Sequence, residues 1–457
     1  MGRHKALFFT LLLTAGCATQ PVSLDSTTPV LPKEWNHQTA SAAGRVNQEW
    51  WLSFGSAELS HLIEQAQAQS LDITAATARV RQAEASAKIA AATLLPPVSS
   101  HLNASREGRI GGNANVDGSH YGAVFSTSYE LDLWGGNRAR RDSALATLQS
   151  DIFARDTVQL TVTTGVASAW LQVVGLHERI AIANQSLHSA ERLLTLIESR
   201  VRAGAATPLE LAQQRGQVAS QQRSLAELQR QVSDAQTVAA LLLGQAHKPN
   251  ISLGTLADVQ APVITSGLPA ELLTRRPDIA RAEARLLAAD ANVLVARAAM
   301  LPNLKLTGGV SSGSDRLLHT LDHPLYSLAS GLTAPIFNAG QLAAGRDLAL
   351  AQREELLADY HMAIIAAFSD VEIALNTLAG IDAQITAQAE VLRQAQRALD
   401  LAENRYRAGA DTLLVLLDAQ RTRYSAHDDA VQLNMLRLQA SVALYKALGG
   451  GWSMQSS

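Results

Sequence analysis

Side chains that carry out chemistry are sparse and scattered along this sequence. The 457 residues include one cysteine, Cys17, and 12 histidines, but no phosphate-binding loop, no HExxH helix and no pair of CxxC motifs. His319 and His323 lie close together, yet turn-forming residues surround them, which favours an exposed loop over a metal site. We therefore expect no catalytic residue, no bound metal and no cofactor, and the chain is not predicted to be an enzyme.

Cys17 stands at the end of an export signal. Arg3 and Lys5 supply positive charge, and residues 6–13 form an apolar run that is too short to span a bilayer. The Gly16-Cys17 pair resembles the end of a bacterial lipoprotein box, which implies a lipid-modified cysteine carrying palmitate. Ala18 resembles the pattern that sorts lipoproteins to the outer membrane. An unmodified cysteine within a signal segment is the alternative.

A polar stretch occurs twice in the chain. Arg200, Arg202, Gly204 and Thr207 recur, 205 positions later, as Arg405, Arg407, Gly409 and Thr412. A long helical pattern enters each copy and a shorter one leaves it. Glycine suits the left-handed residue that ends a helix, and Thr207 with Glu210 forms a capping box for the next one. Each copy is therefore predicted to be the tight tip of an antiparallel helical hairpin.

Three side chains beyond the second copy share one helix face. Leu414, Asp418 and Arg421 lie at positions i, i+4 and i+7, so Arg421 could pair with Asp418. Taken alone, they are typical of a solvated helix face with an ordinary ion pair. The corresponding residues of the first copy are Leu209, Gln213 and Gly216, so the two hairpins are not expected to be equivalent.

The near-constant offset extends over most of the chain and indicates an internal duplication. Helices are predicted over residues 72–95 and 277–301, over 137–202 and 341–407, and over 208–243 and 412–448. A helix of 66 residues is about 100 Å long. A short and an intermediate helix laid end to end nearly match it. Each half therefore offers one continuous and one broken column of helix.

The period changes from helical to two after each short helix. Residues 121–133 and 326–336 alternate between apolar and polar side chains, and their weaker partners are residues 98–106 and 303–311. Strands of this length and pattern suit a membrane β-barrel, although an ordinary soluble hairpin fits equally well. The smallest membrane barrels have about eight strands, so four per chain require an oligomer. The strand count does not choose between two chains and three.

The fold is therefore predicted to be mainly α with a small β part. Residues 1–17 form the signal, 18–57 an extended tail anchored by tryptophans, 58–248 the first repeat, 249–270 a linker, 271–450 the second repeat and 451–457 a C-terminal tail. No other run of roughly 18 apolar residues indicates a transmembrane helix. The net charge of −3 does not point to nucleic acid.

Several motifs together resemble the outer membrane efflux factor family, and most closely its lipoprotein branch. They are the two copies of the tip stretch and the segments Leu273–Ala280, Ala296–Asn303, Pro335–Gly340, Leu417–Arg421 and Ala447–Trp452. The resemblance implies a homotrimer that combines a twelve-stranded β-barrel in the outer membrane with an α-helical barrel in the periplasm. It also implies two partners, a periplasmic adaptor protein and an inner-membrane pump of the resistance-nodulation-division (RND) class.

The resemblance also assigns roles to the tip residues. Leu414, Asp418 and Arg421 match the entrance gate of the family, where three-fold symmetry turns each into a ring. The tips would contact the adaptor through Arg200, Arg202, Gly204, Arg405, Arg407 and Gly409. The implied cargo is drugs or other small toxic solutes, and hence antibiotic resistance. Heavy-metal cation efflux and type I protein secretion are alternatives, and a periplasmic coiled-coil scaffold without a pore is the least favoured one.

Overall fold

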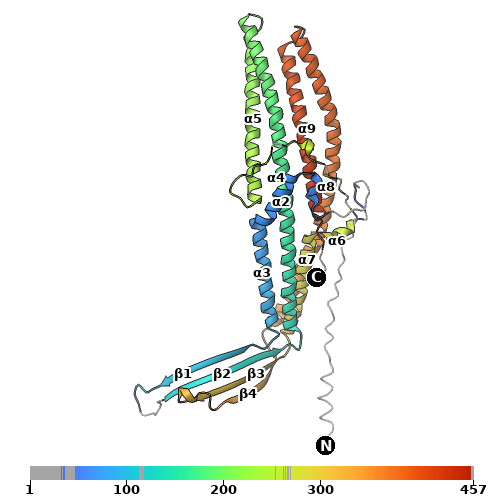
Figure 1. Cartoon of the computed structure of the whole chain (residues 1–457). Helices are drawn as coiled ribbons and strands as arrows, with labels where there is room; N and C mark the ends of the chain where they lie inside the picture. Colours follow the sequence, from blue (N-terminus) through green and yellow to red (C-terminus); the bar gives the residue numbers. More distant parts are fainter. Residues whose placement is uncertain are drawn as a thin grey trace. The chain divides into compact units, whose positions relative to one another are not determined.

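Two helices of 67 residues each dominate the fold, α4 (Gly136–Arg202) and α8 (Gln341–Arg407) (Figure 1). Each is about 100 Å long at 1.5 Å per residue. Both begin after a left-handed glycine, Gly135 or Gly340, and neither contains a proline. The two long helices predicted from the sequence are thus confirmed.

The structure is a computed structural model that describes residues 32, 34–36, 47–112, 118–252, 254–260, 262, 264, 267 and 269–453. All of them belong to one unit, which begins at Pro32. The signal segment and Cys17 lie outside the described residues.

The remaining helices are shorter. The two return helices are α5 (Pro208–Leu242) and α9 (Leu413–Ala447), and the two that precede strands are α3 (Leu71–Ala92) and α7 (Pro277–Ala298). The small ones are α2 (Ala57–Gln69), α6 (Leu272–Arg275) and the 3-10 turns η1 (Trp50–Phe54), η2 (Leu256–Asp258), η3 (Pro269–Glu271) and η4 (Leu317–His319). All six predicted helices are present.

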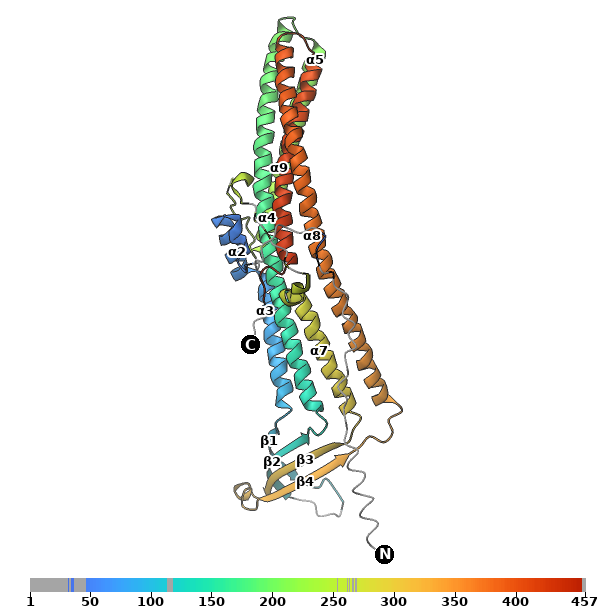
Figure 2. The same cartoon turned by 90° about the vertical axis from the view of Figure 1, so that its right-hand side faces the viewer.

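The helices pack as four neighbouring columns. The broken column of α3 and α5 packs against α4, the broken column of α7 and α9 packs against both α4 and α8, and α8 forms the far edge (Figure 1 and Figure 2). The two edge columns carry exposed apolar side chains, among them Ile89, Leu241, Met362 and Ile373. This set of helices is therefore open at both edges in the single chain.

One described helix, α8, contains an 18-residue window with the length and mean hydropathy of a membrane span, which the sequence analysis did not anticipate. The whole helix is about three times as long as the hydrocarbon core of a bilayer is thick. In addition, 44% of the window is buried, and α8 packs on α7 and α9. We attribute the apolar window to helix packing.

The four strands form one antiparallel sheet in the order β1-β2-β3-β4. They are β1 (Val98–Glu107), β2 (Gly118–Leu131), β3 (Asn303–Ser314) and β4 (Leu325–Thr333). The central pairing of β2 with β3 joins the two repeats. Within the described part of the chain, β1 and β4 each pair on one side only.

The register separates polar from apolar side chains. One cross-strand row on the first face consists of Ser99, Ser126, Gly309 and Ser327. A row on the other face contains Phe125, Val310 and Tyr326, and the same face also carries Leu102 and Leu328. Leu328 is 82% exposed in the single chain. The predicted alternation is confirmed, and the apolar face is open.

Two strands end earlier than predicted, and the local chemistry explains both ends. β2 stops at Leu131 because Asp132 turns away to accept hydrogen bonds from the backbone N–H groups of Asn137 and Arg138, both at 2.9 Å. It thereby caps the start of α4. β4 stops at Thr333, two residues before Pro335, which has no N–H to donate to a ladder. Residues 132–133 and 334–336 are therefore not strand.

The three residues Gly449–Gly451, shortly after the end of α9, occupy positions where only glycine fits. Gly449, Gly450 and Gly451 all have positive φ, and a Cβ on Gly449 would lie 1.9 Å from the backbone oxygen of Arg275. Nearby, the Arg276 guanidinium donates to the carbonyl oxygen of Ala447 at 3.2 Å and pairs with Asp278 and Asp370. These contacts fix the C-terminal end of α9 to neighbouring elements.

We predict that Gly449→Ala destabilises the protein by more than about 3 kcal/mol, because backbone strain and a backbone clash add together. Gly340→Ala is the matched control, since Gly340 also has positive φ but no atom lies within 4 Å of a Cβ there. The control should lose roughly 1–2 kcal/mol. Thermal unfolding in detergent, followed by circular dichroism, measures both, and equal losses would contradict the packing described here.

Candidate functional site at the helical tips

Each long helix turns back at a tight tip. In the first tip (residues 200–207), Gly204 has φ +72°, and the N–H of Ala205 donates to the carbonyl of Arg200 at 2.7 Å. The capping box is present, because Thr207 Oγ1 accepts from the N–H of Glu210 and the Glu210 carboxylate accepts from the N–H of Thr207. The predicted hairpin is confirmed.

The second tip (residues 405–412) forms the same turn, but a different side-chain contact stabilises it. Gly409 has φ +74°, and the N–H of Ala410 donates to the carbonyl of Arg405 at 2.9 Å. Thr412 makes no side-chain cap. Instead, Arg405 Nε lies 2.5 Å from Asp411 Oδ2, and this hydrogen bond lowers the pKa of Asp411. An ion pair thus replaces the capping box of the first tip.

Both tip glycines are open to solvent, and no atom lies within 4 Å of a Cβ built on Gly204 or Gly409. The tip arginines point in different directions. The guanidinium of Arg200 lies 5.5 Å from the ring centroid of Tyr406, whereas Arg407 pairs with Glu403 at 3.4 Å. Arg202 donates to Ser199 Oγ at 3.1 Å. The structure therefore presents bare backbone and several cations at one end of the helices.

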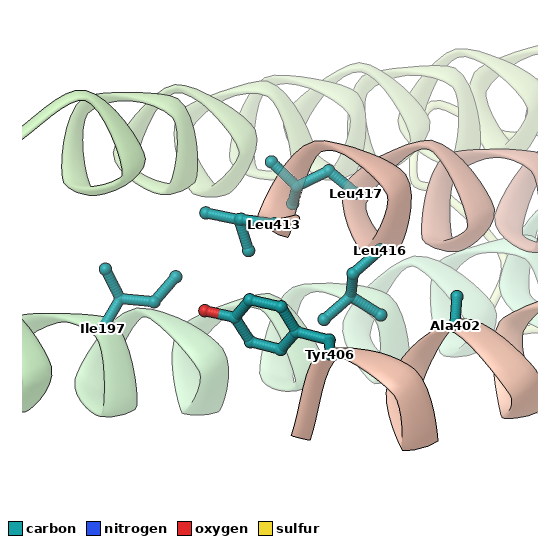
Figure 3. Packing of buried hydrophobic residues seen from close by; sticks show 6 residues of the cluster. All are labelled: Ile197, Ala402, Tyr406, Leu413, Leu416 and Leu417. Atoms are coloured by element: carbon teal, nitrogen blue, oxygen red, sulfur yellow. The ribbon is translucent and has the colours of Figure 1, made fainter. Parts of the chain in front are cut away.

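A buried apolar cluster, the tip cluster, holds the second hairpin against α4 (Figure 3). Its members are Ile197 from α4, Ala402 and Tyr406 from α8, and Leu413, Leu416 and Leu417 from α9. The Tyr406 hydroxyl is buried and has no hydrogen-bond partner among the residues that the structure describes. Among the described residues, apolar packing and the Arg200–Tyr406 contact, rather than an ion pair, therefore join the two hairpins at this level.

The three predicted gate residues lie together on the outside of this cluster. Leu414 is 59% exposed, and it follows the buried Leu413. Arg421 Nη2 lies 3.6 Å from Asp418 Oδ1, and both side chains are exposed, at 61% and 74%. The expected shared face and the expected ion pair are both present. No part of the described chain buries them, so the face is free to meet solvent or another copy.

The first hairpin differs at the corresponding level. Leu209 is exposed, but Gln214 is fully buried and donates its Nε2 to the carbonyl of Ala190 at 2.7 Å. An exposed pair, Arg215 with Glu198, links α5 to α4. The burial of Gln214 could not be predicted from the sequence, because a single glutamine in a polar helix gives no signal that its side chain is buried.

An ion pair that could not be predicted from the sequence lies farther from the tips. Arg179 on α4 donates two hydrogen bonds of 2.8 Å to the carboxylate of Asp428 on α9. Their side chains are only 18% and 16% exposed, and the hydrogen bond raises the pKa of Arg179. Among the ion pairs of the described residues, it is the one that joins the two hairpins.

Metal chemistry finds no cluster of ligands in the part of the chain that the structure describes, because no group of three or more His, Cys, Asp or Glu side chains comes together there. His319 Nδ1 lies 2.6 Å from Asp322 Oδ2, and both side chains are exposed.

Comparison with known proteins gives a consistent set of matches. A family model described as outer membrane efflux protein matches residues 62–245 and 268–450. The chain is 46% identical over 461 residues to the pyoverdine export outer membrane protein OpmQ of Pseudomonas aeruginosa PAO1, which covers 98% of this chain and 97% of that protein. It is 48% identical over 465 residues to OpmQ of Pseudomonas putida KT2440, with 99% and 98% covered.

More distant relatives have other names. The cation efflux system protein CusC of Escherichia coli K12 is 29% identical over 97% of this chain, and the toluene efflux pump outer membrane protein TtgC of Pseudomonas putida is 31% identical over 99%. Among solved structures, the open state of the MtrE outer membrane channel of Neisseria gonorrhoeae matches with a TM-score of 0.85 and 28% identity. That match covers 94% of this chain and 97% of MtrE.

We predict that Leu416→Ala loosens the second hairpin, because truncating a buried leucine typically costs about 2–5 kcal/mol. Leu401→Ala is the matched control, since Leu401 on α8 is exposed in the chain. Hydrogen–deuterium exchange of residues 405–420 should quicken in the first variant and stay unchanged in the second. Unchanged exchange in Leu416→Ala would show that the tip cluster does not hold the hairpin.

Proposed function

The chain belongs to the outer membrane efflux protein family, and from this premise we propose that it is the exit duct of a tripartite export system. Its family and its fold are those of outer membrane channels, which are not enzymes. The observation that carries the proposal is the four-stranded sheet, which has an open apolar face and, within the described residues, an edge strand on each side that pairs with one neighbour only.

We propose a homotrimer on the basis of closure. Unpaired backbone groups are costly in hydrocarbon, so the strands must close into a barrel. Two copies would give eight strands, and the interior of a barrel of that size is filled by side chains or holds one small ligand. Three copies would give twelve strands and a wider interior, which suits a duct better. The exposed apolar side chains on α8 and on the column of α3 and α5 would close the helices in the same ring.

The orientation in the outer membrane follows from the two faces of the sheet. Its apolar face would contact lipid, and its serine-rich face would line the lumen. Cys17, which lies outside the described residues, would carry palmitate and anchor the chain in the same membrane. The helices would then extend into the periplasm for about 100 Å.

The exposed tips are the surface available to a periplasmic adaptor. The bare backbone at Gly204 and Gly409 would let a partner approach closely, while Arg200, Arg202, Arg405 and Arg407 would supply cations around it. Through that adaptor the duct would work with an inner-membrane pump of the RND class. The tips suit docking because neither glycine has a side chain that would keep a partner away from the turn.

The gate would form where three copies of α9 meet. A ring of Leu414 would resist wetting, and a ring of Asp418 would attract cations unless it is paired. The Asp418–Arg421 contact of 3.6 Å supplies such a pair within each copy. Exposed pairs of this kind are weak, which suits a closed state that opens when the adaptor engages.

For the cargo, we propose an iron-chelating siderophore of the pyoverdine kind. The two relatives named for pyoverdine export are 46% and 48% identical to this chain, whereas those named for cation or toluene efflux are 29% and 31% identical. Export of drugs or solvents is the second candidate, supported by the relative named for toluene efflux. The alternatives of cation efflux and protein secretion are less favoured.

A gene deletion tests the duct and its tips together. We expect the deletion to lower the siderophore in the culture supernatant, measured by an iron-exchange colour assay, and the wild-type gene to restore it. Gly409→Trp should assemble but fail to restore export, because its bulk blocks adaptor docking. Gly409→Ala controls for backbone strain and should restore most of it. An unchanged supernatant after deletion would refute the siderophore assignment.

We predict that Asp418→Ala makes the closed channel leak, because Arg421 loses its partner in all three copies. Each exposed pair contributes less than about 1 kcal/mol, so a severalfold rise in leak is expected from the three together. Conductance in planar bilayers and vancomycin entry into cells measure it. Asp400→Ala, an exposed aspartate on α8, should leave both unchanged. A wild-type conductance in Asp418→Ala would rule out the proposed gate.

A further inference from the structure

The helix α9 is held differently at its two ends. Its C-terminal end is fixed by the glycine passage at Gly449–Gly451 and by the Arg276 guanidinium on the carbonyl of Ala447. Its N-terminal end, at the second tip, packs on α4 through the apolar side chains of the tip cluster, and the adjoining end of α8 contacts α4 through Arg200 over the Tyr406 ring. Because α9 is fixed at its C-terminal end and held more weakly at its N-terminal end, it can move at its N-terminal end.

The Arg179–Asp428 pair lies between these ends. At 1.5 Å per residue, Asp428 is about 24 Å from Thr412 and about 29 Å from Ala447 along the helix. The linker between the repeats reaches the same level, because the N–H of Leu256 donates to Glu178 at 2.9 Å. Leu256 itself is buried, and its 3-10 turn contacts both α4 and α9. The linker therefore packs on α4 and α9 at the level of the Arg179–Asp428 pair.

The contacts on the two sides of the pair differ in kind. Toward the C-terminal end of α9, a Cβ on Gly175 would lie only 2.6 Å from Met435 Sδ, so the helices are in close contact. Gln439 also donates to Gln172 at 3.0 Å there. Toward the tip, the hairpins meet through apolar side chains: Tyr424 packs against the buried Leu176 and Leu228, and the tip cluster lies beyond. Apolar side chains can part without leaving a buried charge, whereas separating Arg179 from Asp428 would leave two.

We propose that the Arg179–Asp428 pair is the fulcrum of the gate, about which the tip segment of the second hairpin turns when the duct opens. The pair stays closed in both states, and the moving part of α9 is residues 413–427. Arg179 and Asp428 are thus positioning residues that set how far from the tip the channel opens. This inference rests on the proposed function as a gated duct.

Cross-linking at two levels tests the fulcrum. Arg179→Cys with Asp428→Cys replaces the pair, and Ile197→Cys with Leu416→Cys lies in the tip cluster. Each double variant is joined by a short bis-thiosulfonate reagent and released by reductant, and single-cysteine variants control for modification alone. We expect siderophore export to persist when positions 179 and 428 are joined and to be lost, reversibly, when positions 197 and 416 are joined. Equal loss at both levels would overturn the fulcrum.

Charge variants test the same idea without cargo. Arg179→Gln should increase vancomycin entry, and the exchange Arg179→Asp with Asp428→Arg should reverse that increase. Arg437→Gln is the matched control, because Arg437 pairs with Asp382 inside the second hairpin, at 2.5 Å. A tight closed state in Arg179→Gln, or an equal leak in Arg437→Gln, would contradict the proposal.

The outcomes also distinguish failure of the proposed fulcrum from failure of the proposed function. Unheated gel migration reports whether each variant assembles, and a variant that does not assemble leaves the cross-linking result as the deciding one. If the wild-type protein assembles but exports no siderophore, the proposed cargo fails, whereas the vancomycin comparison still decides the fulcrum.

Discussion

The constraint on which the structure depends is the unpaired backbone at the two edges of a four-stranded sheet. Within the described residues, β1 and β4 each pair on one side only, and the apolar face of the sheet is open in the single chain. Neither feature suits a monomer in water or in lipid. Closure with further copies satisfies the edges, and it simultaneously brings together the apolar side chains at the edges of the helical columns. One requirement thus accounts for both the strand part and the helical part.

The two halves of the chain have the same order of elements, and the difference between their tips is the basis of the proposed gate. Both tips turn on a left-handed glycine, at Gly204 and Gly409. The first hairpin is fastened by a capping box and by the fully buried Gln214, whereas the second has the tip cluster, exposed charges and two hydrogen bonds that are only part-buried, from Gln388 to Ala426 and from Arg423 to Gln396. A hairpin held by packing can move at lower cost than one held by buried polar contacts. The second hairpin is therefore the better suited to movement.

The sequence predicted the features that local patterns determine. The helices, the glycines at the tips and the alternating strands could all be predicted from the sequence. Leu414, Asp418 and Arg421 share a helix face, as their spacing requires. The exact strand ends were not, because Asp132 leaves the ladder to cap α4 and Pro335 lies just beyond β4. The Arg179–Asp428 pair joins residues 249 positions apart, so no local pattern could reveal it. The burial of Gln214 likewise depends on tertiary packing.

Cargo is the part of the proposed function that the chain itself specifies least, because the proposed duct would accept what its pump delivers. Its architecture is a sharper claim and rests on closure by several copies. Native mass spectrometry of the detergent-purified mature protein tests that claim most directly. The account predicts a single species with the mass of three chains. A species with the mass of one chain, or of two, would contradict it.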